Sequence, residues 1–384
     1  MDKNIIQIGV YDAKLTKFEN QYPTPEGITY NSYLIIDDKI AVVDTVDARA
    51  ADRWFDNLLS ALPQGRTPDY LIVEHLEPDH SSQIARLMHR FPDCRIICSA
   101  AAARMLPAVI GTDEFKDRIT PVGEGDTLLL GSHTLTFILA PMIHWPEVMM
   151  VYVPESGVLF SADAFGRFGH PEASEWAEEG ARYYLNIVGK YGKPVQNLIA
   201  KLRDKDIRTI APLHGPVLSG DITPYFDLYR KWSSYEHEDD GVLIAVASIH
   251  GLTAGAALRV AELLKQKGVE SVTTIKLTHS DMSQAVREAF RMKHIILMAS
   301  TYDGDVFTPM ADFLHRLALK GYCNRSVAIV ENGLWAPVAG KKMKAAVEAM
   351  PGMKIAEPIV TLRGHYADEN ITQLTEMVDN LLSL

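Results

Sequence analysis

Two histidines and three acids crowd seven consecutive positions, Glu74 to His80, in the stretch VEHLEPDHSS. The apolar run YLIV directly precedes them and predicts a buried strand. The polar residues therefore lie on the loop at the carboxyl end of that strand, where a rigid sheet can hold metal ligands together. A solvated acidic turn is the alternative for this cluster alone. The side chains that could coordinate an ion are His75, Glu77, Asp79 and His80.

Similar residues follow three later apolar runs. His144 lies in APMIHWPE, Asp163 in LFSADAFG and His214 in IAPLHGP, each flanked by proline, glycine or small residues. This repetition at strand ends favours a metal site over a solvated turn, because ligands on separate loops can meet at one edge of a sheet. The other histidines have no such setting and are expected at the surface or at caps; they include His89, His133, His170, His237, His279, His294, His315 and His365.

Histidine and carboxylate ligands without thiolate suit hard or borderline divalent ions, which include iron, manganese and zinc. A carboxylate that bridges two ions, as Asp163 could, explains why so many ligands are present. Two ions a few ångströms apart clamp either a hydrolytic water or a small diatomic molecule. The chemistry of such a site then depends on the domain that accompanies it.

The first part of the chain is rich in short strands. The β-rich runs are SYLIID, KIAVVDTV, DYLIVEHL, RIICSA, LTFILAP, MMVYVP, GVLFSAD and RTIAPLHG. Helical periodicity appears between some of them, as in RWFDNLLSAL and SSQIARLMHRF, so we expect sheets with helices packed outside. The segment WSSYEHEDDG at 232–241 then breaks the hydrophobic pattern and is typical of an exposed linker between domains.

Beyond this linker, strands and helices alternate. VLIAVAS, SVTTIKL, HIILMAS, SVAIVEN and KIAEPIV are apolar runs of the kind found in doubly covered parallel strands, and an amphipathic segment follows each. Five such units predict a doubly wound α/β domain, whose ligand lies beyond the carboxyl ends of the strands at the switch point. The loops after the first, third and fourth strands are therefore the candidate binding loops.

These three loops suit a planar, phosphorylated ligand. SIHGLT, residues 248–253, offers hydroxyls, a glycine and the amides of a helix N-terminus, which can form a phosphate cradle. It has neither G-x-G-x-x-G spacing nor the lysine of a P-loop, so a monophosphate is favoured. STYDGDVF and ENGLW supply Tyr302 and Trp335, between which a planar ring could lie. Ordinary βα turns with an N-cap are the alternative.

Length and composition exclude several classes of protein. The chain has 384 residues, which suggests two domains, and 47% of them are apolar, as in globular proteins. Its net charge of −11 disfavours nucleic acid as a partner. No apolar run approaches the roughly 20 residues of a membrane span, and no signal-peptide pattern is present, so a cytoplasmic location without membrane contact is expected. Cys94, Cys98 and Cys323 are expected to be small buried residues.

Together these motifs resemble the flavodiiron proteins, also called A-type flavoproteins. The resemblance runs through TYNSYLIIDDK, VVDTVD, EHLEPDHSS, MIHWPEVMMVYVPE, LFSADAFG, LHGP and the later loops, and covers essentially the whole chain. It implies an α/β protein with a metallo-β-lactamase-like αββα sandwich at 1–236 and a flavodoxin-like five-stranded parallel sheet at 241–384. Hydrolases of this superfamily carry His-x-His-x-Asp-His. Glu77 stands in place of their second histidine, and this oxygen ligand favours iron over zinc.

The resemblance also implies the metal ligands. One iron would take His75, Glu77 and His144. The second would take Asp79 and His214, with Asp163 bridging the two. His80 matches a histidine that ligates in the hydrolases and is turned away in some flavodiiron members, and it is included as a further candidate ligand.

In the second domain the resemblance implies FMN. Its phosphate and ring would be held by Ser248, His250, Gly251, Thr253, Thr301, Tyr302, Asp303, Gly304, Asn332, Gly333 and Trp335. Three residues depart from the family pattern: His250 stands where an aromatic residue is usual, Asp303 where an asparagine is usual and Glu331 where a serine is usual. An added carboxylate near the flavin would oppose an anionic reduced form through like-charge repulsion.

The function implied is reduction of dioxygen to water, of nitric oxide to nitrous oxide, or both, for detoxification in an anaerobe. A head-to-tail homodimer, or a dimer of dimers, would set the flavin of one subunit against the irons of another. The sequence shows neither a four-cysteine rubredoxin module nor a dinucleotide fingerprint, so a separate rubredoxin or similar carrier is the expected electron donor.

Two other functions stay open at this point. The first is a dinuclear zinc hydrolase of the metallo-β-lactamase type with an appended flavodoxin-like module. Glu77 and the lack of an evident substrate-binding insertion count against it. The second is a binding or electron-carrier protein with an incomplete metal site, against which the presence of all six matched ligands counts.

Overall fold

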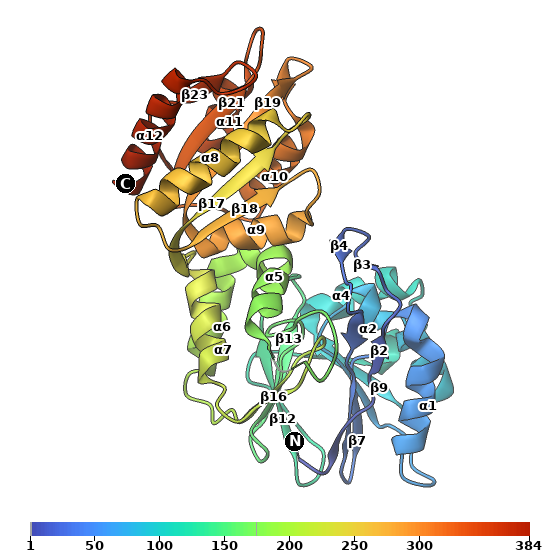
Figure 1. Cartoon of the computed structure of the whole chain (residues 1–384). Coiled ribbons are helices and arrows are strands. Elements are labelled where there is room, and N and C mark those ends of the chain that lie inside the picture. Colours follow the sequence, from blue (N-terminus) through green and yellow to red (C-terminus); the bar gives the residue numbers. More distant parts are fainter. Residues whose placement is uncertain (1, 174) are drawn as a thin grey trace. The chain divides into compact units, whose positions relative to one another are not determined.

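The structure is a computed structural model that describes residues 2–173 and 175–384. The chain forms two compact units, one ending at Ser233 and the other beginning at Ser234. In Figure 1 the first unit runs from blue to yellow-green and the second from yellow to red. Each unit has its own sheets and its own hydrophobic core, so each is described separately.

Two mixed sheets form the centre of the first unit. One has the order β1-β6-β7-β8-β9-β10, and its last four strands run parallel. The other has the order β11-β12-β13-β14-β15-β16 and is antiparallel except for β14 and β15. The strand bounds are β1 Ile5–Gln7, β6 Tyr33–Ile36, β7 Ile40–Val43, β8 Tyr70–Val73, β9 Arg95–Ser99, β10 Ile119–Val122, β11 Thr127–Leu129, β12 Thr134–Leu139, β13 Met149–Val153, β14 Val158–Phe160, β15 Thr209–Ala211 and β16 Leu218–Ser219.

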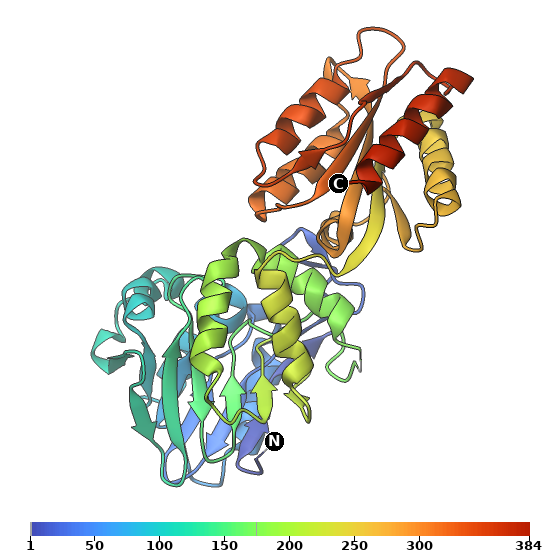
Figure 2. The same cartoon turned by 90° about the vertical axis from the view of Figure 1, so that its left-hand side faces the viewer.

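The core of this unit lies between the two sheets. Tyr33, Val43 and Ile72 from one sheet pack with Phe137 and Val151 from the other, all fully buried. Helices cover the outer faces (Figures 1 and 2), as the αββα prediction requires. They are α1 (Ala51–Ala61), α3 (Ile84–Arg90) and α4 (Ala100–Ile110) beside the first sheet, and α5 (Ala177–Ile187), α6 (Gly192–Leu202) and α7 (Thr223–Ser233) beside the second.

Several short elements of the first unit are not predicted by the sequence patterns. β2 (Val10–Asp12) pairs with β5 (Ile28–Tyr30), and β3 (Lys17–Phe18) pairs with β4 (Tyr22–Pro23). Runs of two or three residues are too short to show a period of two. The four-residue helix α2 (Pro78–Ser81) follows β8 and contains two of the candidate ligands.

The second unit is a doubly wound domain, as predicted. Its parallel strands have the order β18-β17-β19-β21-β22, in which the first strand of this unit, β17, lies beside its third, β19. The strands are β17 (Asp239–Ala247), β18 (Val272–Lys276), β19 (Met292–Tyr302), β21 (Ser326–Asn332), β22 (Lys354–Ile355) and β23 (Val360–Leu362). The fifth strand, expected to be continuous, is divided into β22 and β23, and β20 (Asp305–Val306) forms a hairpin on β19.

Helices cover both faces of this sheet (Figure 2). On one face, Val260 of α8 and Leu374 of α12 are buried with Ile244 and Val330 of the strands. The helices of that face are α8 (Leu252–Gln266) and α12 (Asp368–Leu382). The other face carries α9 (Met282–Arg291), α10 (Thr308–Leu319) and α11 (Ala339–Glu348).

The segment between the units is less exposed than predicted. Trp232 is buried at the end of α7, and Asp239 already belongs to β17. The buried Arg287 contacts both carboxylate oxygens of Glu238, at 2.8 and 3.1 Å. Glu238 therefore has a structural partner, whereas Glu236 and Asp240 of the same segment are exposed.

Burial of the histidines also differs from expectation at two positions. His133 is buried, and its Nδ1 lies 2.7 Å from Oδ2 of Asp37. His294 is buried in β19, so a surface role was wrong for both. Cys94 and Cys98 are buried, as predicted, whereas Cys323 is only partly buried. Within the described residues, no helix is both long and apolar enough to span a bilayer.

Candidate functional site

Two groups of buried side chains meet at the strand ends of the first unit. Within the described residues, each group offers ligand atoms that all lie within 4.8 Å of one another. The first group consists of His75, Glu77, His144 and Asp163. The second group consists of Asp79, His80 and His214. All seven residues are those singled out from the sequence.

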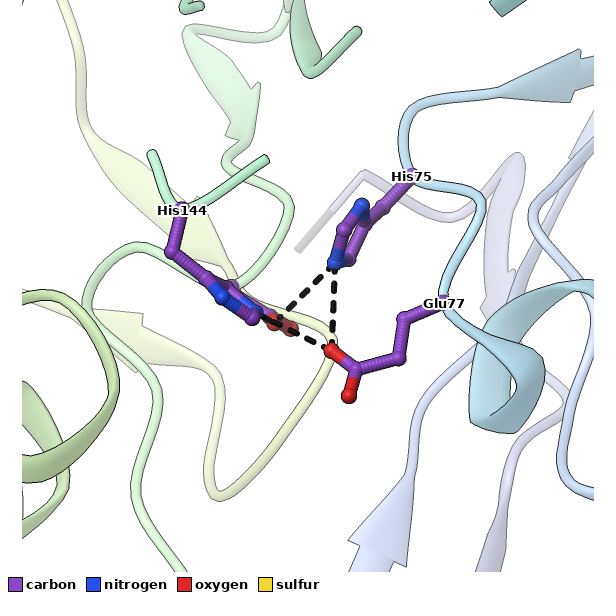
Figure 3. A group of neighbouring side chains, drawn as sticks. His75, Glu77 and His144 are labelled. Carbon is purple, nitrogen blue, oxygen red and sulfur yellow. Dashed lines mark hydrogen bonds and ion pairs between the residues drawn. The ribbon is translucent and has the colours of Figure 1, made fainter. Parts of the chain in front are cut away.

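Different loops bring the first group together. His75 and Glu77 follow β8, His144 follows β12 and Asp163 follows β14. Figure 3 shows the side chains of His75 and Glu77 pointing toward that of His144. Nε2 of His144 lies 3.0 Å from Oε2 of Glu77 and 3.1 Å from Oδ2 of Asp163. Donors from both sheets therefore converge on one point.

Asp163 faces both groups, one with each oxygen. Its Oδ2 lies 3.1 Å from Nε2 of His144, in the first group. Its Oδ1 lies 3.2 Å from Nε2 of His80 and 3.7 Å from Nε2 of His214, in the second. This placement of one carboxylate between two sets of donors is what a bridging ligand requires.

His80 is turned into the second group. Its Nε2 lies 3.3 Å from Oδ2 of Asp79, and Nε2 of His214 lies 3.1 Å from the same oxygen. The sequence left open whether His80 points toward the centre or away from it. In this chain it points toward the centre, so the second group contains three candidate ligands.

The two groups carry strongly coupled charges. Burial opposes ionisation of Glu77, but the His144 and His75 rings beside it lower the pKa of this carboxyl to about 2. Burial likewise opposes the imidazolium form of His144, but Asp163 and Glu77 raise the pKa of its ring to about 9. In the same way Asp79 and Asp163 outweigh burial and raise the pKa of His214 to about 8. The carboxylates thus attract positive charge, from protons or from an ion.

Several buried atoms of these groups fit metal ligation. Both carboxylate oxygens of Asp79, both ring nitrogens of His80, Oδ1 of Asp163 and Nε2 of His214 are buried without a well-formed hydrogen bond among the described residues. Buried polar atoms are almost always paired, so such a cluster needs an explanation. Oxygen and imidazole donors without thiolate suit iron, manganese or zinc.

Further buried groups orient these side chains. Oε1 of Glu147 lies 2.8 Å from Nδ1 of His75 and accepts a hydrogen bond from the Leu76 amide. The Thr29 carbonyl lies 2.6 Å from Nδ1 of His214. In each case Nε2 is left facing the centre, which is the usual arrangement of a metal-ligating histidine. Neither residue type nor spacing distinguishes Glu147 or Thr29 in the sequence as a group that orients a ligand.

Two more carboxylates hold the backbone around the site. Oδ1 of Asp44 accepts hydrogen bonds from the amides of Glu74 and His75, at 3.1 and 3.4 Å. The fully buried Glu74 accepts from Val151 at 3.0 Å and from Ala162, the residue before Asp163, at 3.3 Å. Glu74 therefore joins the loop of His75 to the sheet and loop that carry the opposite ligands.

Backbone strain accompanies this packing. Asp44, Ala162 and Phe165 have φ angles of 50, 48 and 63°, in the left-handed region that side chains other than glycine rarely adopt. Such conformations persist where the surroundings determine them, and they gather at functional sites. Here Ala162 and Phe165 lie on either side of Asp163, and Asp44 accepts a hydrogen bond from the amide of His75.

A groove of about 420 Å³ gives access to the site. Glu77 and Asp79 contribute to its lining, so the two groups can be reached from outside the unit. The remaining lining residues are Leu15, Lys17, Phe18, Glu19, Asn20, Tyr30, Asp47, Arg49 and Pro78.

In the second unit, the loop after β17 has the features of an anion site. Gly251 precedes α8 with a φ of 91°, and its amide donates to Oγ of Ser248 at 3.1 Å. No heavy atom lies within 4 Å of the place where a Cβ of Gly251 would be, among the described residues. The first amides of a helix have no intrahelical partner, so this open space fits a phosphate. His250 is exposed beside it, and the buried Thr253 hydroxyl lies 3.0 Å from Oγ of Ser300.

The loop after β19 is a tight hairpin turn with an exposed aromatic residue. Tyr302 pairs with Asp305 across the turn and is 47% exposed. The central residues, Asp303 and Gly304, have φ angles of 51 and 72°. An Asp-Gly pair is among the preferred sequences of such a turn, which gives Asp303 a structural reason. Thr301 lies at the end of β19, just before this turn.

The loop after β21 is anchored at its base and exposed at its tip. The side chain of Asn332 exchanges two hydrogen bonds with the backbone of Gly364, at 2.9 and 3.0 Å. Gly333 donates to the Leu362 carbonyl. Trp335 is 79% exposed. Exposed aromatic residues on two neighbouring strand-end loops fit a planar ring that would cover them.

Known proteins resemble the chain over its whole length. Residues 28–215 match the family described as ODP family beta lactamase. The solved structures of the flavodiiron protein from Giardia intestinalis and of rubredoxin oxygen:oxidoreductase from Desulfovibrio gigas share its fold, each with a TM-score of 0.93 and 23% identity. They cover 99% and 100% of this chain and 95% and 97% of their own chains. A nitric oxide reductase of Moorella thermoacetica is 31% identical over 97% of this chain and 95% of its own length.

The chain belongs to the flavodiiron protein family. The structure of this flavodiiron protein also shows what holds the side chain of Glu331. Glu331 was expected to add a carboxylate near the flavin. Both of its oxygens accept hydrogen bonds within the protein, from the amide of Gly340 and the hydroxyl of Thr361. Its neighbour Asn332 lies on the opposite face of β21, because successive strand residues alternate between faces.

Proposed function

We propose that this flavodiiron protein is an oxidoreductase with a diiron centre and FMN, which reduces nitric oxide to nitrous oxide, dioxygen to water, or both. The observation that carries the proposal is Asp163, whose two oxygens face two separate groups of buried donors. Glu77, in place of the second histidine of the related hydrolases, supports iron over zinc. Relatives of the chain support the reaction, since one is named a nitric oxide reductase and another a rubredoxin oxygen:oxidoreductase.

The proposed diiron centre uses the residues of the two groups. His75, Glu77 and His144 would hold one iron, and Asp79, His80 and His214 the other, with Asp163 between them. Bound iron would supply the positions at which the gas is reduced, and bound FMN would supply the electrons. Glu147 and Thr29 keep the ring nitrogens of His75 and His214 turned to the centre.

The proposed FMN site uses the three strand-end loops of the second unit. Ser248, His250, Gly251 and Thr253 would surround the phosphate at the start of α8. Tyr302 and Trp335 would cover the ring. The residues proposed to line its edges are Thr301, Asp303, Gly304, Asn332 and Gly333.

We also propose a separate electron donor and an assembly of subunits. The name of the Desulfovibrio gigas relative supports a rubredoxin or similar carrier as the donor. A head-to-tail homodimer, or a dimer of such dimers, would place the flavin of one subunit beside the irons of the next. Sedimentation of the FMN- and iron-loaded protein tests the proposed assembly of subunits.

The experiment that tests the function is rapid mixing of the anaerobically reduced, iron-loaded protein with each gas. Reoxidation of the bound flavin is followed by its absorbance. Fast reoxidation that depends on iron is expected with at least one of the two gases. Slow reoxidation by both gases, unchanged by removal of iron, would overturn the proposal. Zinc in place of iron in the purified protein, with hydrolysis of a lactam or thioester, would favour the hydrolase alternative.

A further inference from the structure

Glu331 is a buried carboxylate with two partners on different elements. It lies near the end of β21 and is 8% exposed. Its Oε2 accepts a hydrogen bond from the amide of Gly340 at 2.8 Å, in the first turn of α11. Its Oε1 accepts from the hydroxyl of Thr361 in β23, at 2.9 Å. The carboxylate thus links a strand end, a helix start and the neighbouring strand.

Thr301 also binds the start of the same helix. Its Oγ1 accepts hydrogen bonds from the amides of Val338 and Ala339, at 3.0 and 3.1 Å. Val338 itself provides no side-chain cap for α11. Three consecutive amides at the start of α11 are therefore satisfied by side chains from β19 and β21. A negative charge at this end of the helix also interacts favourably with the helix dipole.

The absence of a side chain at Gly340 leaves room for the carboxylate of Glu331. A Cβ at this position would lie 3.0 Å from Cδ of Glu331 and 3.2 Å from Oε1. Together with a contact of 3.2 Å to Cγ2 of Ile359, these distances would require the carboxylate to shift by a few tenths of an ångström. A side chain at position 340 would therefore disturb the hydrogen bonds of the Glu331 carboxylate.

The segment held in this way carries the exposed aromatic residue. Between β21 and α11 lie residues 333–338, with Leu334 63% and Trp335 79% exposed. The β21 end of the segment is fixed by the hydrogen bonds between Asn332 and Gly364. The α11 end is fixed by Thr301 and Glu331. The tip is thus exposed, while both ends are anchored.

We propose that Glu331 is a positioning residue for the flavin ring, which acts by capping α11 and so holds the loop that presents Trp335. The inference rests on the proposed function, since it requires FMN at these loops. A serine at this position would end two bonds short of the carboxylate oxygens and could not reach both partners. Where a small residue is usual, the carboxylate of Glu331 therefore links three elements, which are β21, α11 and β23.

The experiment compares two substitutions of Glu331 in the full chain. Glu331→Gln keeps an acceptor for Gly340 and a polar partner for Thr361, and removes the charge. Glu331→Ala removes both hydrogen bonds. Glu348→Ala, at an exposed position on the same helix, is the matched control. Each apoprotein is titrated with FMN, and the dissociation constant and the residual flavin fluorescence at saturation are measured.

We expect Glu331→Ala to weaken FMN binding about tenfold and to raise the residual fluorescence, because Trp335 is no longer held against the ring. Glu331→Gln is expected to stay within about twofold of the unsubstituted protein, as is Glu348→Ala. Circular dichroism checks folding. Gly340→Ala, which keeps Glu331 but displaces its carboxylate, should shift both readouts in the same direction as Glu331→Ala.

Three outcomes overturn the inference. Glu331→Ala could bind FMN with unchanged affinity and unchanged fluorescence. Glu331→Gln could lose as much as Glu331→Ala, which would show that charge and not position matters. A misfolded Glu331→Ala with an unaffected Gly340→Ala would also contradict it. If the unsubstituted protein binds no FMN, the proposed function itself fails, and this result is distinct from the other three.

Discussion

The candidate metal groups and the candidate flavin loops both lie at carboxyl ends of strands, yet they differ in exposure. His75 and Asp163 are fully buried, whereas Tyr302 and Trp335 are 47% and 79% exposed. An ion is small and needs side-chain donors already gathered in a closed place. A flavin is large and flat, so it can cover exposed aromatic residues with its own surface. The protein therefore encloses the site of the small ion by itself, whereas the larger flavin would cover the exposed residues of its own site.

The two regions are also held in place differently. Around the metal groups, the buried carboxylates of Glu74 and Glu147 fix ligands through bonds between the two sheets. In the second unit, Thr301 and Glu331 fix the start of a helix and leave the loop before it exposed. Substitutions in the first region should therefore act on metal content, and those in the second on flavin affinity.

The largest effect is expected from Asp163→Ala. Removing the carboxylate that faces both groups should release both irons and lower turnover more than about 100-fold, while flavin content stays unchanged. Metal analysis, flavin absorbance and gas reduction measure the three quantities. Asp113→Ala, an exposed change in the same unit, is the control. Full turnover in the Asp163 variant would refute the dinuclear assignment.

Glu147 allows orientation and charge to be separated. Glu147→Ala removes the group beside Nδ1 of His75 and should weaken iron binding about 10- to 100-fold. Glu147→Gln keeps the acceptor oxygen and loses the charge, so a smaller loss is expected. Competition with a chelator of known affinity gives the values. Equal losses in the two variants would mean that charge alone accounts for the effect.

Two glycines of the second unit allow a controlled test of the proposed phosphate site, with Gly251 as the test position and Gly255 as the control. Gly251→Ala places a side chain at a φ of 91° and should cost about 1–2 kcal/mol, with weaker FMN binding. Gly255→Ala, inside α8 with open space around it, should stabilise the helix by about 0.5–1 kcal/mol and leave FMN affinity unchanged. Iron content should not change in either variant. Equal FMN affinities in the two would argue against a phosphate at the start of α8.

The smallest expected effect is a pH dependence confined to the second unit. Burial, together with the charges of Lys293 and His237, lowers the pKa of His294 to about 4. Between the pKa of an unfolded histidine, about 6.5, and that value, the unfolded state binds the proton that the folded state excludes. The second unit should therefore lose stability on the order of 1 kcal/mol or less between pH 7 and pH 5, because solvent screens part of this effect. Urea unfolding followed by hydrogen exchange of a β19 peptide measures this loss.

His294→Gln should flatten the pH dependence of β19 without changing that of the first unit. A peptide from β13 serves as the internal control. If the variant keeps the full slope, another group is responsible.

Much of the metal site follows from sequence because its ligands are placed by simple rules. An apolar run that ends in histidine or a carboxylate positions that side chain at a strand end, and parallel strand ends share an edge. His144, Asp163 and His214 each follow a run of this kind. The doubly wound unit is predicted equally well, since its strands and helices have clear periods.

Long-range partners could not be predicted in this way. Glu147 orients His75 across 72 positions of sequence, and nothing local marks it as different from a surface acid. Glu331 gained an expected role from its departure from a family pattern, but its actual partners, Gly340 and Thr361, depend on the packing of three elements. Tertiary packing also determines the division of the fifth strand and the contact of Arg287 with Glu238. The periodicity of a sequence predicts which face of a helix or strand is buried, but not which distant residues that face contacts.

The position of Asp163 would affect how the proposed centre fills with iron. A carboxylate that is turned and held by an ion on one side presents its second oxygen to the other side without further loss of rotational freedom. The first ion thus lowers the entropic cost of the second, which is positive cooperativity without any change of fold. At limiting iron, the population should consist mainly of empty and doubly loaded molecules, and native mass spectrometry would show few with a single ion.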